Sequence, residues 1–130
     1  MVMHSRMTTT RRILLADDEV DIIFVLAELL KSEGNEIEIA RNGTECVALF
    51  KSRAAEGISF DLLIVDYRMP KKDGGQVIEE IRAIKSDQKI LLMSAFSQDV
   101  LKMQNEKHLE ILTNPFDFEG FLDKVLMMMK

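Results

Sequence analysis

Short apolar runs alternate regularly with longer segments of helical periodicity, and this alternation constrains the fold more than any other feature of the chain. Strand-like runs occupy residues 12–16, 36–39, 61–66, 89–93 and 109–112. Apolar residues recur with helical spacing at 20–32, at 44–55, beyond Gly75 and from about Asp117, whereas 98–107 is polar and weakly amphipathic. Parallel strands need crossover connections of this kind. We therefore predict an α/β fold, a doubly wound five-stranded parallel sheet with helices on both faces.

Individual elements carry further predictions. Glu36 and Glu38 alternate with isoleucines, a pattern typical of a half-exposed strand at a sheet edge. The run that ends at Asp66 is apolar throughout, so this strand is expected to be buried on both faces. Cys46 is expected in the core side of the second helix. Five apolar side chains of the last helix are expected to point inward: Phe118, Phe121, Leu122, Val125 and Leu126.

Size and composition narrow the class of protein. A chain of 130 residues suits one domain, which we expect over residues 11–130, after a disordered N-terminal tail of residues 1–10. The net charge is -5 and no cluster of basic residues stands out, so direct DNA binding is not expected. Neither glycine-rich phosphate loop occurs, which disfavours a nucleotide cofactor.

The sequence argues against a membrane-spanning helix and against disulfide bonds. Its longest apolar stretch, residues 22–30, is interrupted by Glu28 and is far shorter than the roughly 20 residues of a membrane helix. Membrane insertion is therefore not expected. Cys46 is the single cysteine, so no internal disulfide or thiolate metal site can form, and a cytoplasmic location is the natural expectation.

Acidic residues close two of the predicted strands. Asp66 ends one apolar run, and Asp17 and Asp18 follow another directly. The carboxyl ends of strands are where α/β sheets hold their ligands, so these acids can converge on one cation. Three carboxylates in such proximity repel one another and raise the pKa of at least one of them. A site of oxygen ligands suits Mg²⁺, with Mn²⁺ as the second choice. Alternatively, the first acids cap a helix and Asp66 is a turn residue.

Five short motifs follow the predicted strands in order: Asp17-Asp18, Asp66 before Met69-Pro70, Asp73-Gly74, Ser94-Ala95 and Asn114-Pro115-Phe116. Together they resemble the receiver domain of two-component response regulators. The resemblance implies the flavodoxin-like strand order 2-1-3-4-5. It also implies that Asp66 is the phosphoacceptor and that Ser94 is the hydroxyl that turns toward the phosphoryl group. Mg²⁺ would bind Asp18, Asp66 and the backbone carbonyl of Arg68, with Asp17 holding a metal-bound water.

The chain departs from the receiver pattern at two positions. Asn114 stands where receivers typically carry a lysine, and it donates a neutral hydrogen bond without supplying charge. Ile111 stands where receivers often place an aromatic switch residue. Arg68 is long enough to approach a phosphoryl group, although a solvated loop arginine is an equally good reading. The resemblance also predicts a cis peptide bond between Asn114 and Pro115.

Three functions fit these residues. The leading one is a single-domain response regulator that accepts a phosphoryl group from a sensor histidine kinase or phosphotransfer protein and signals to an unknown protein target. Such a phosphoacceptor is not an enzyme in the metabolic sense, although it can lose its phosphoryl group slowly. The alternative is an atypical receiver that acts as a phosphorylation-independent interaction scaffold. A phosphohydrolase with Asp66 as nucleophile is the third, and Arg68 disfavours it because such enzymes commonly carry an acid there.

Overall fold

The sheet has five parallel strands in the order β2-β1-β3-β4-β5, as predicted. This computed structural model describes residues 10–130, so the predicted tail lies almost wholly outside the described residues. The strands are β1 (Arg12–Ala16), β2 (Glu36–Ala40), β3 (Leu62–Asp66), β4 (Ile90–Ser94) and β5 (Leu109–Thr113). Strand β1 pairs with both β2 and β3, and the chain therefore reverses its direction of winding at β1 and β3.

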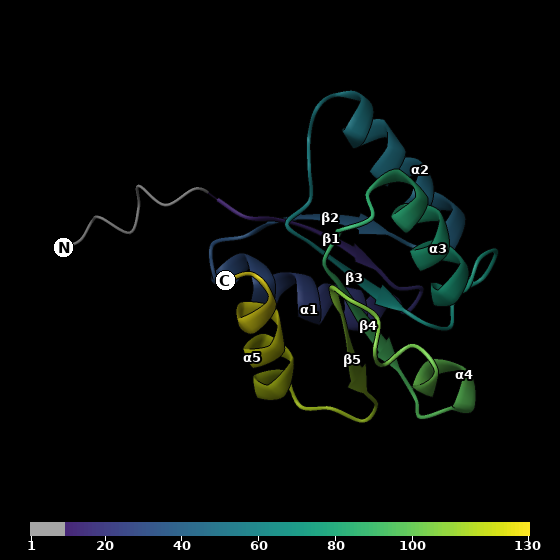
Figure 1. Ribbon diagram of the computed structural model, residues 1–130. Helices are drawn as coiled ribbons and strands as arrows, with labels where there is room; N and C mark the ends of the chain where they lie inside the picture. Colours follow the sequence, from purple (N-terminus) through teal and green to yellow (C-terminus); the bar gives the residue numbers. More distant parts are fainter. Residues whose placement is uncertain (1–9) are drawn as a thin grey trace.

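Helices cover both faces of the sheet, and each follows a strand (Figure 1). They are α1 (Val20–Ser32), α2 (Gly43–Ala55), α3 (Gly74–Ile84), α4 (Gln98–Leu101) and α5 (Phe118–Met128). Helices α1 and α5 lie on one side, and α2 and α3 lie on the other. The prediction of a doubly wound α/β fold is confirmed.

Two apolar clusters, one on each face, hold the layers together. Leu14 and Val65 point toward α2 and α3, where they pack with Cys46, which is fully buried as predicted. Leu15 and Ile64, their neighbours along the strands, point the other way toward α1 and α5. Successive strand residues alternate between faces, so a central strand covered on both sides must be apolar throughout. The uninterrupted runs of β1 and β3 follow from this position.

The inward face of α5 differs from the sequence-based expectation, whereas the short helix after β4 agrees with its polar, weakly amphipathic sequence. The polar segment after β4 forms only one helical turn, and Val100 is its one buried apolar residue within α4. In α5 the buried residues are Phe121, Val125 and Met128, while Phe118 and Leu126 are 48% and 46% exposed. The inward orientation predicted for those two is wrong. The three buried residues lie at positions i, i+4 and i+7 and form the stripe of α5 that packs on the sheet. This stripe is narrower than the set of apolar residues in the helix, so some of them are left exposed.

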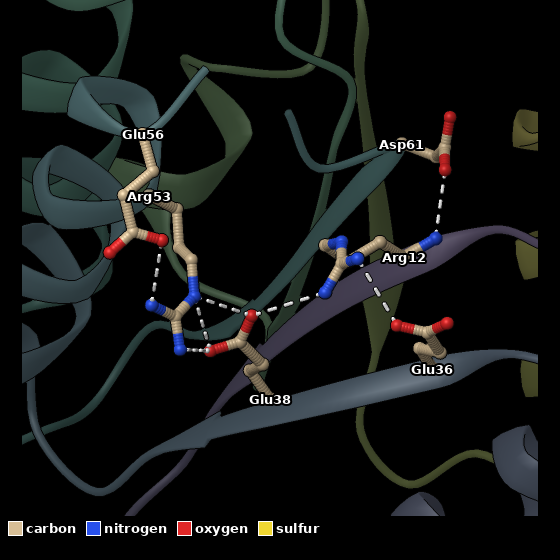
Figure 2. Close-up of polar contacts among 6 residues, drawn as sticks. All are labelled: Arg12, Glu36, Glu38, Arg53, Glu56 and Asp61. Carbon is tan, nitrogen blue, oxygen red and sulfur yellow. Dashed lines mark hydrogen bonds and ion pairs between the residues drawn. The ribbon is translucent and has the colours of Figure 1, made fainter. Parts of the chain in front are cut away.

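A network of ion pairs joins β1, β2 and α2 at the amino-terminal half of the sheet (Figure 2). Glu38 is central: its carboxylate lies 2.7 Å from the Arg53 guanidinium and 3.6 Å from that of Arg12. Arg12 also pairs with Glu36 at 3.2 Å, and Arg53 with Glu56 at 3.4 Å. The acidic residues that alternate along β2 are therefore partnered, which suits a strand at the edge of the sheet.

No helix within residues 10–130 is long and apolar enough to cross a membrane. The cytoplasmic location expected from the sequence stays a prediction.

Candidate functional site

Three carboxylates gather at the carboxyl-terminal edge of the sheet. Asp66 is the last residue of β3, and Asp17 and Asp18 follow β1 directly. One oxygen from each of the three lies within 4.8 Å of the others. Because β1 and β3 are paired neighbours, the acids meet where the winding of the sheet reverses. The predicted convergence of these acids is confirmed in the structure.

Local hydrogen bonds fix the loop that carries Asp17. Its backbone N–H donates to the carbonyl of Ala40 at 3.1 Å, which continues the pairing of β1 with β2 by one residue. Its carboxylate accepts a hydrogen bond from the Glu19 backbone N–H at 3.0 Å. Glu19 is the N-cap residue of α1 but makes no side-chain capping bond. Asp17 therefore holds the turn that leads into α1 and belongs to the acidic cluster, but no side chain of the first acids caps the helix, and Asp18 is exposed to solvent.

The loop after Asp66 is held against the start of α3. The Tyr67 N–H donates to the Met93 carbonyl at 2.9 Å, and the Gly74 N–H donates to the Tyr67 carbonyl at 2.7 Å. A Cβ atom at Gly74 would lie 2.8 Å from the Tyr67 Cα, so only glycine permits this approach. Asp73 caps α3 in a capping box with Gln76.

Burial and mutual repulsion shift the acidity of the cluster. Burial, followed by the charges of Asp17, Asp18 and Glu19, raises the pKa of Asp66 to about 7. Burial also raises the pKa of Asp17, which is only 3% exposed. The pKa of two carboxyls is raised as predicted, but burial contributes more to the shift than the repulsion between the acids. A divalent cation would relieve this conflict, and the donor set of carboxylate oxygens fits Mg²⁺.

A hollow, here called the site pocket, opens beside the acids. Its lining residues come from the ends of four strands or the loops after them: Asp18, Glu19, Asp66, Tyr67, Arg68, Ser94, Ala95 and Asn114. The sequence-predicted residues Asp18, Asp66, Arg68, Ser94 and Asn114 are thus brought together. Buried Asp17 lines an adjoining hollow that also reaches Asp66 and Asn114. The structure therefore assembles every predicted site residue at one edge of the sheet.

Ser94 and Asn114 are positioned by the pairing of β4 with β5. The Ser94 carbonyl accepts a hydrogen bond from the Asn114 N–H at 2.8 Å, which holds the two loop starts together. Ser94 is only 6% exposed, and its hydroxyl donates a hydrogen bond to the Ala95 carbonyl at 2.7 Å. The Asn114-Pro115 peptide bond is cis, as predicted.

Residues 13–126 match the sequence profile of the response regulator receiver domain. The chain belongs to this family. A response regulator receiver protein of Anaeromyxobacter sp. is 35% identical over 115 residues, which cover 87% of this chain and 46% of the relative. The transcriptional regulatory protein PdtaR of Mycobacterium tuberculosis is 36% identical over 118 residues, which cover 88% of this chain and 55% of PdtaR.

A solved receiver structure shows the same architecture. The response regulator protein TrrA from Thermotoga maritima, in complex with Mg²⁺-BeF, is 36% identical and superposes with a TM-score of 0.77. The match covers 92% of this receiver and 99% of that chain. The chain spans about half or less of the length of the curated relatives that it matches. The activities of those longer proteins are therefore not assigned to this chain.

Glu19 was not among the sequence-predicted site residues, yet it lines both hollows. Its charge contributes to the raised pKa of Asp66. The signal was present in the uninterrupted run Asp17-Asp18-Glu19, but a helix-start role for the third acid explained it equally well. Tyr67 was also missed, because a residue between two polar site residues carries no chemical signal of its own.

Proposed function

We propose that this receiver domain accepts a phosphoryl group on Asp66, in the presence of Mg²⁺, from a phosphohistidine of a sensor kinase or phosphotransfer protein. The observation that carries the proposal is the acidic cluster of Asp17, Asp18 and Asp66, with oxygens within 4.8 Å at the edge where the site pocket opens. Membership in the receiver family and the Mg²⁺-BeF complex of a 36% identical relative support it.

The residues of the cluster divide the work of holding the cation. Asp18, Asp66 and the backbone carbonyl of Arg68 would hold the cation, and Asp17 would hold its water. The bound cation supplies charge that offsets the carboxylates and the incoming phosphoryl oxygens. Asp66 is half-buried and its pKa is raised, so a cation bound beside it would favour the ionised, nucleophilic carboxylate at neutral pH.

The transfer itself forms one bond and breaks one. An Asp66 carboxylate oxygen forms the new O–P bond while the N–P bond to the donor imidazole breaks, and the imidazole nitrogen keeps the electron pair and takes up a proton. The Ser94 hydroxyl, which now donates to the Ala95 carbonyl, turns to donate to a phosphoryl oxygen. The product is an acyl phosphate, so the protein acts as a phosphoacceptor with slow loss of the group to water.

The consequence proposed for signalling is a changed contact with a protein target. Reorientation of Ser94 at the end of β4 alters the start of the loop that leads to the one-turn α4. The target of this receiver is proposed to be a protein and not DNA, in keeping with the net charge of -5.

Phosphorylation by a small donor tests the proposal. The protein is incubated with acetyl phosphate and Mg²⁺, with Mn²⁺, or with EDTA, and its intact mass is measured. We expect a single phosphoryl adduct in wild type with either cation, none with EDTA and none in Asp66→Asn. Asp123→Asn, which removes an exposed carboxylate elsewhere, is the matched control and keeps the adduct. An adduct that survives Asp66→Asn contradicts the assignment, and no adduct even with a cognate kinase favours the scaffold alternative.

A further inference from the structure

The site pocket holds several acids and little positive charge. Asp18, Glu19 and Asp66 line it, and Asn114 occupies the place where a cation would be expected from the family resemblance. An acyl phosphate on Asp66 replaces a carboxylate of one negative charge with a group that carries about two. Even with a divalent cation in place, the phosphorylated pocket keeps an excess of negative charge unless another cation reaches it.

Arg68 is the one basic residue among the eight that line the site pocket. It is exposed and makes no salt bridge within 4.0 Å to any residue of the described part of the chain. The two lysines that follow in the loop are placed differently. Lys72 pairs with Glu80 at 2.7 Å, and Lys71 does not line the pocket. Arg68 alone therefore combines position in the pocket with an unengaged charge.

We infer that the Arg68 guanidinium contacts the phosphoryl oxygens on Asp66 and supplies the positive charge that Asn114 lacks. This inference rests on the function proposed above. Consecutive Cα atoms are about 3.8 Å apart, so the Arg68 Cα lies at most roughly 7 Å from that of Asp66, within reach of an arginine side chain. A guanidinium stays charged at every relevant pH, and its parallel N–H groups match a pair of phosphoryl oxygens.

The role assigned to Arg68 is stabilisation of charge without proton transfer. When acetyl phosphate is the donor, the Asp66 oxygen forms the O–P bond while the P–O bond to acetate breaks, and acetate leaves with the electron pair. No proton is exchanged in this step. The guanidinium contributes only its charge and hydrogen bonds, so its effect should depend on charge at this position and be recoverable from a cation placed on the other side of the pocket.

Substitution of Arg68 tests the inference. The rate of adduct formation with acetyl phosphate and Mg²⁺ is measured by intact mass for wild type, Arg68→Gln, Arg68→Lys and the double variant Arg68→Gln/Asn114→Lys. We expect Arg68→Gln to slow the reaction about 10-fold or more, the difference between a charged and a neutral hydrogen bond. Arg68→Lys is expected to be intermediate, and Asn114→Lys is expected to restore most of the lost rate. Lys71→Gln removes the same charge three residues away and should react like wild type.

Binding of the phosphoryl analogue beryllofluoride gives a second readout. The chain has one tyrosine and no tryptophan, and Tyr67 lies between Asp66 and Arg68, so intrinsic fluorescence reports on this loop alone. With Mg²⁺ present, Arg68→Gln should weaken beryllofluoride binding by a similar factor without weakening Mg²⁺ binding itself.

The outcomes separate this inference from the proposed function. If wild type forms no Asp66-dependent adduct, the proposed function fails. If wild type reacts but Arg68→Gln reacts and binds beryllofluoride equally well, phosphorylation stands and the role of Arg68 is overturned. A slowed Arg68→Gln that Asn114→Lys leaves unrescued, with Mg²⁺ binding also weakened, shows instead that the side chain only shapes the loop and likewise overturns the inference.

Discussion

Asp66→Asn should make the metal-free protein more stable, although it removes the proposed phosphoacceptor. The substitution keeps the size of the side chain and an oxygen that can accept a hydrogen bond, while it removes one of the three charges of the acidic cluster. In a chelating buffer at pH 8, we expect the melting temperature of Asp66→Asn to exceed that of wild type. Addition of Mg²⁺ should raise the melting temperature of wild type more than that of the variant, since a ligand stabilises the state that binds it.

The size of the effect follows from the geometry of the cluster. At 4.8 Å, the upper limit on the separation of these oxygens, two unit charges repel by about 3.5 kcal/mol at an effective dielectric constant of 20 and by about 0.9 kcal/mol in bulk water. Asp66 is half-buried, so solvent screens part of this repulsion. We therefore expect a gain of roughly 1 to 3 kcal/mol, which corresponds to roughly 3 to 12 °C for a domain of this size.

The gain should depend on pH in a defined direction. Burial and neighbouring charges raise the pKa of Asp66 to about 7 from its usual value of 3.8. Between these values the folded protein keeps the proton that the unfolded chain has lost, so wild-type stability falls as pH rises. Above about pH 7 the loss is complete, and below about pH 4 it vanishes. The advantage of Asp66→Asn should thus be largest at pH 8 and should shrink steadily toward pH 4.

Thermal unfolding followed by circular dichroism measures both variants in chelator and in Mg²⁺ across this range. Asp123→Asn removes one exposed negative charge on α5 and serves as the control for net charge. The reasoning is refuted if Asp66→Asn gains no more than Asp123→Asn at pH 8, or if its advantage is the same at pH 4 as at pH 8.

Three further substitutions test the elements around the site. Glu38→Gln breaks the centre of the ion-pair network and should lower the free energy of unfolding by about 1 kcal/mol. Glu28→Gln removes a partner from a pair whose side chains are both more than half exposed, and it should change stability very little. Equal effects of the two substitutions in urea unfolding would contradict the role of the network. Gly74→Ala places a methyl group against the backbone of the site loop, so it should lower stability by roughly 1 to 3 kcal/mol and slow adduct formation. At Gly75 the nearest atom to an added methyl group is a side-chain atom at 3.3 Å, so Gly75→Ala should cost much less in the same unfolding assay. Asp73→Ala removes the capping box of α3 and should lower stability by about 1 kcal/mol; an unchanged denaturation midpoint would show that the box contributes nothing.

The features that follow from local pattern were predictable from the sequence. The bounds of β1 and α1 match the apolar runs and helical spacing, because burial on one face or two leaves a periodic trace in the chain. The acids after β1 and β3 converge because carboxyl ends of parallel strands share one edge. The segment after β4 gave a weak signal for a physical reason, since a single turn that buries only Val100 leaves no period to read.

Other features depend on partners that are distant in the sequence. Arg53 and Glu38 are 15 residues apart, and Arg12 and Asp61 are 49 apart, so no local pattern predicts these contacts. The exposure of Phe118 is of the same kind, because it depends on how α5 sits on the sheet. At the site, Glu19 had a sufficient local explanation at a helix start, and only the assembled pocket shows that it also faces Asp66.

The ion-pair network and the acidic cluster lie toward opposite ends of the same strands. Arg12 opens β1 and Asp17 follows its last residue, so these two charged residues are about 16 Å apart along the strand. Dissolved monovalent salt weakens attraction at the first and repulsion at the second. Salt therefore has two opposing effects on folding, and the stability of the metal-free protein should depend only weakly on salt. Once a divalent cation has neutralised the acidic cluster, only the effect on the ion pairs remains, and added salt should destabilise the protein.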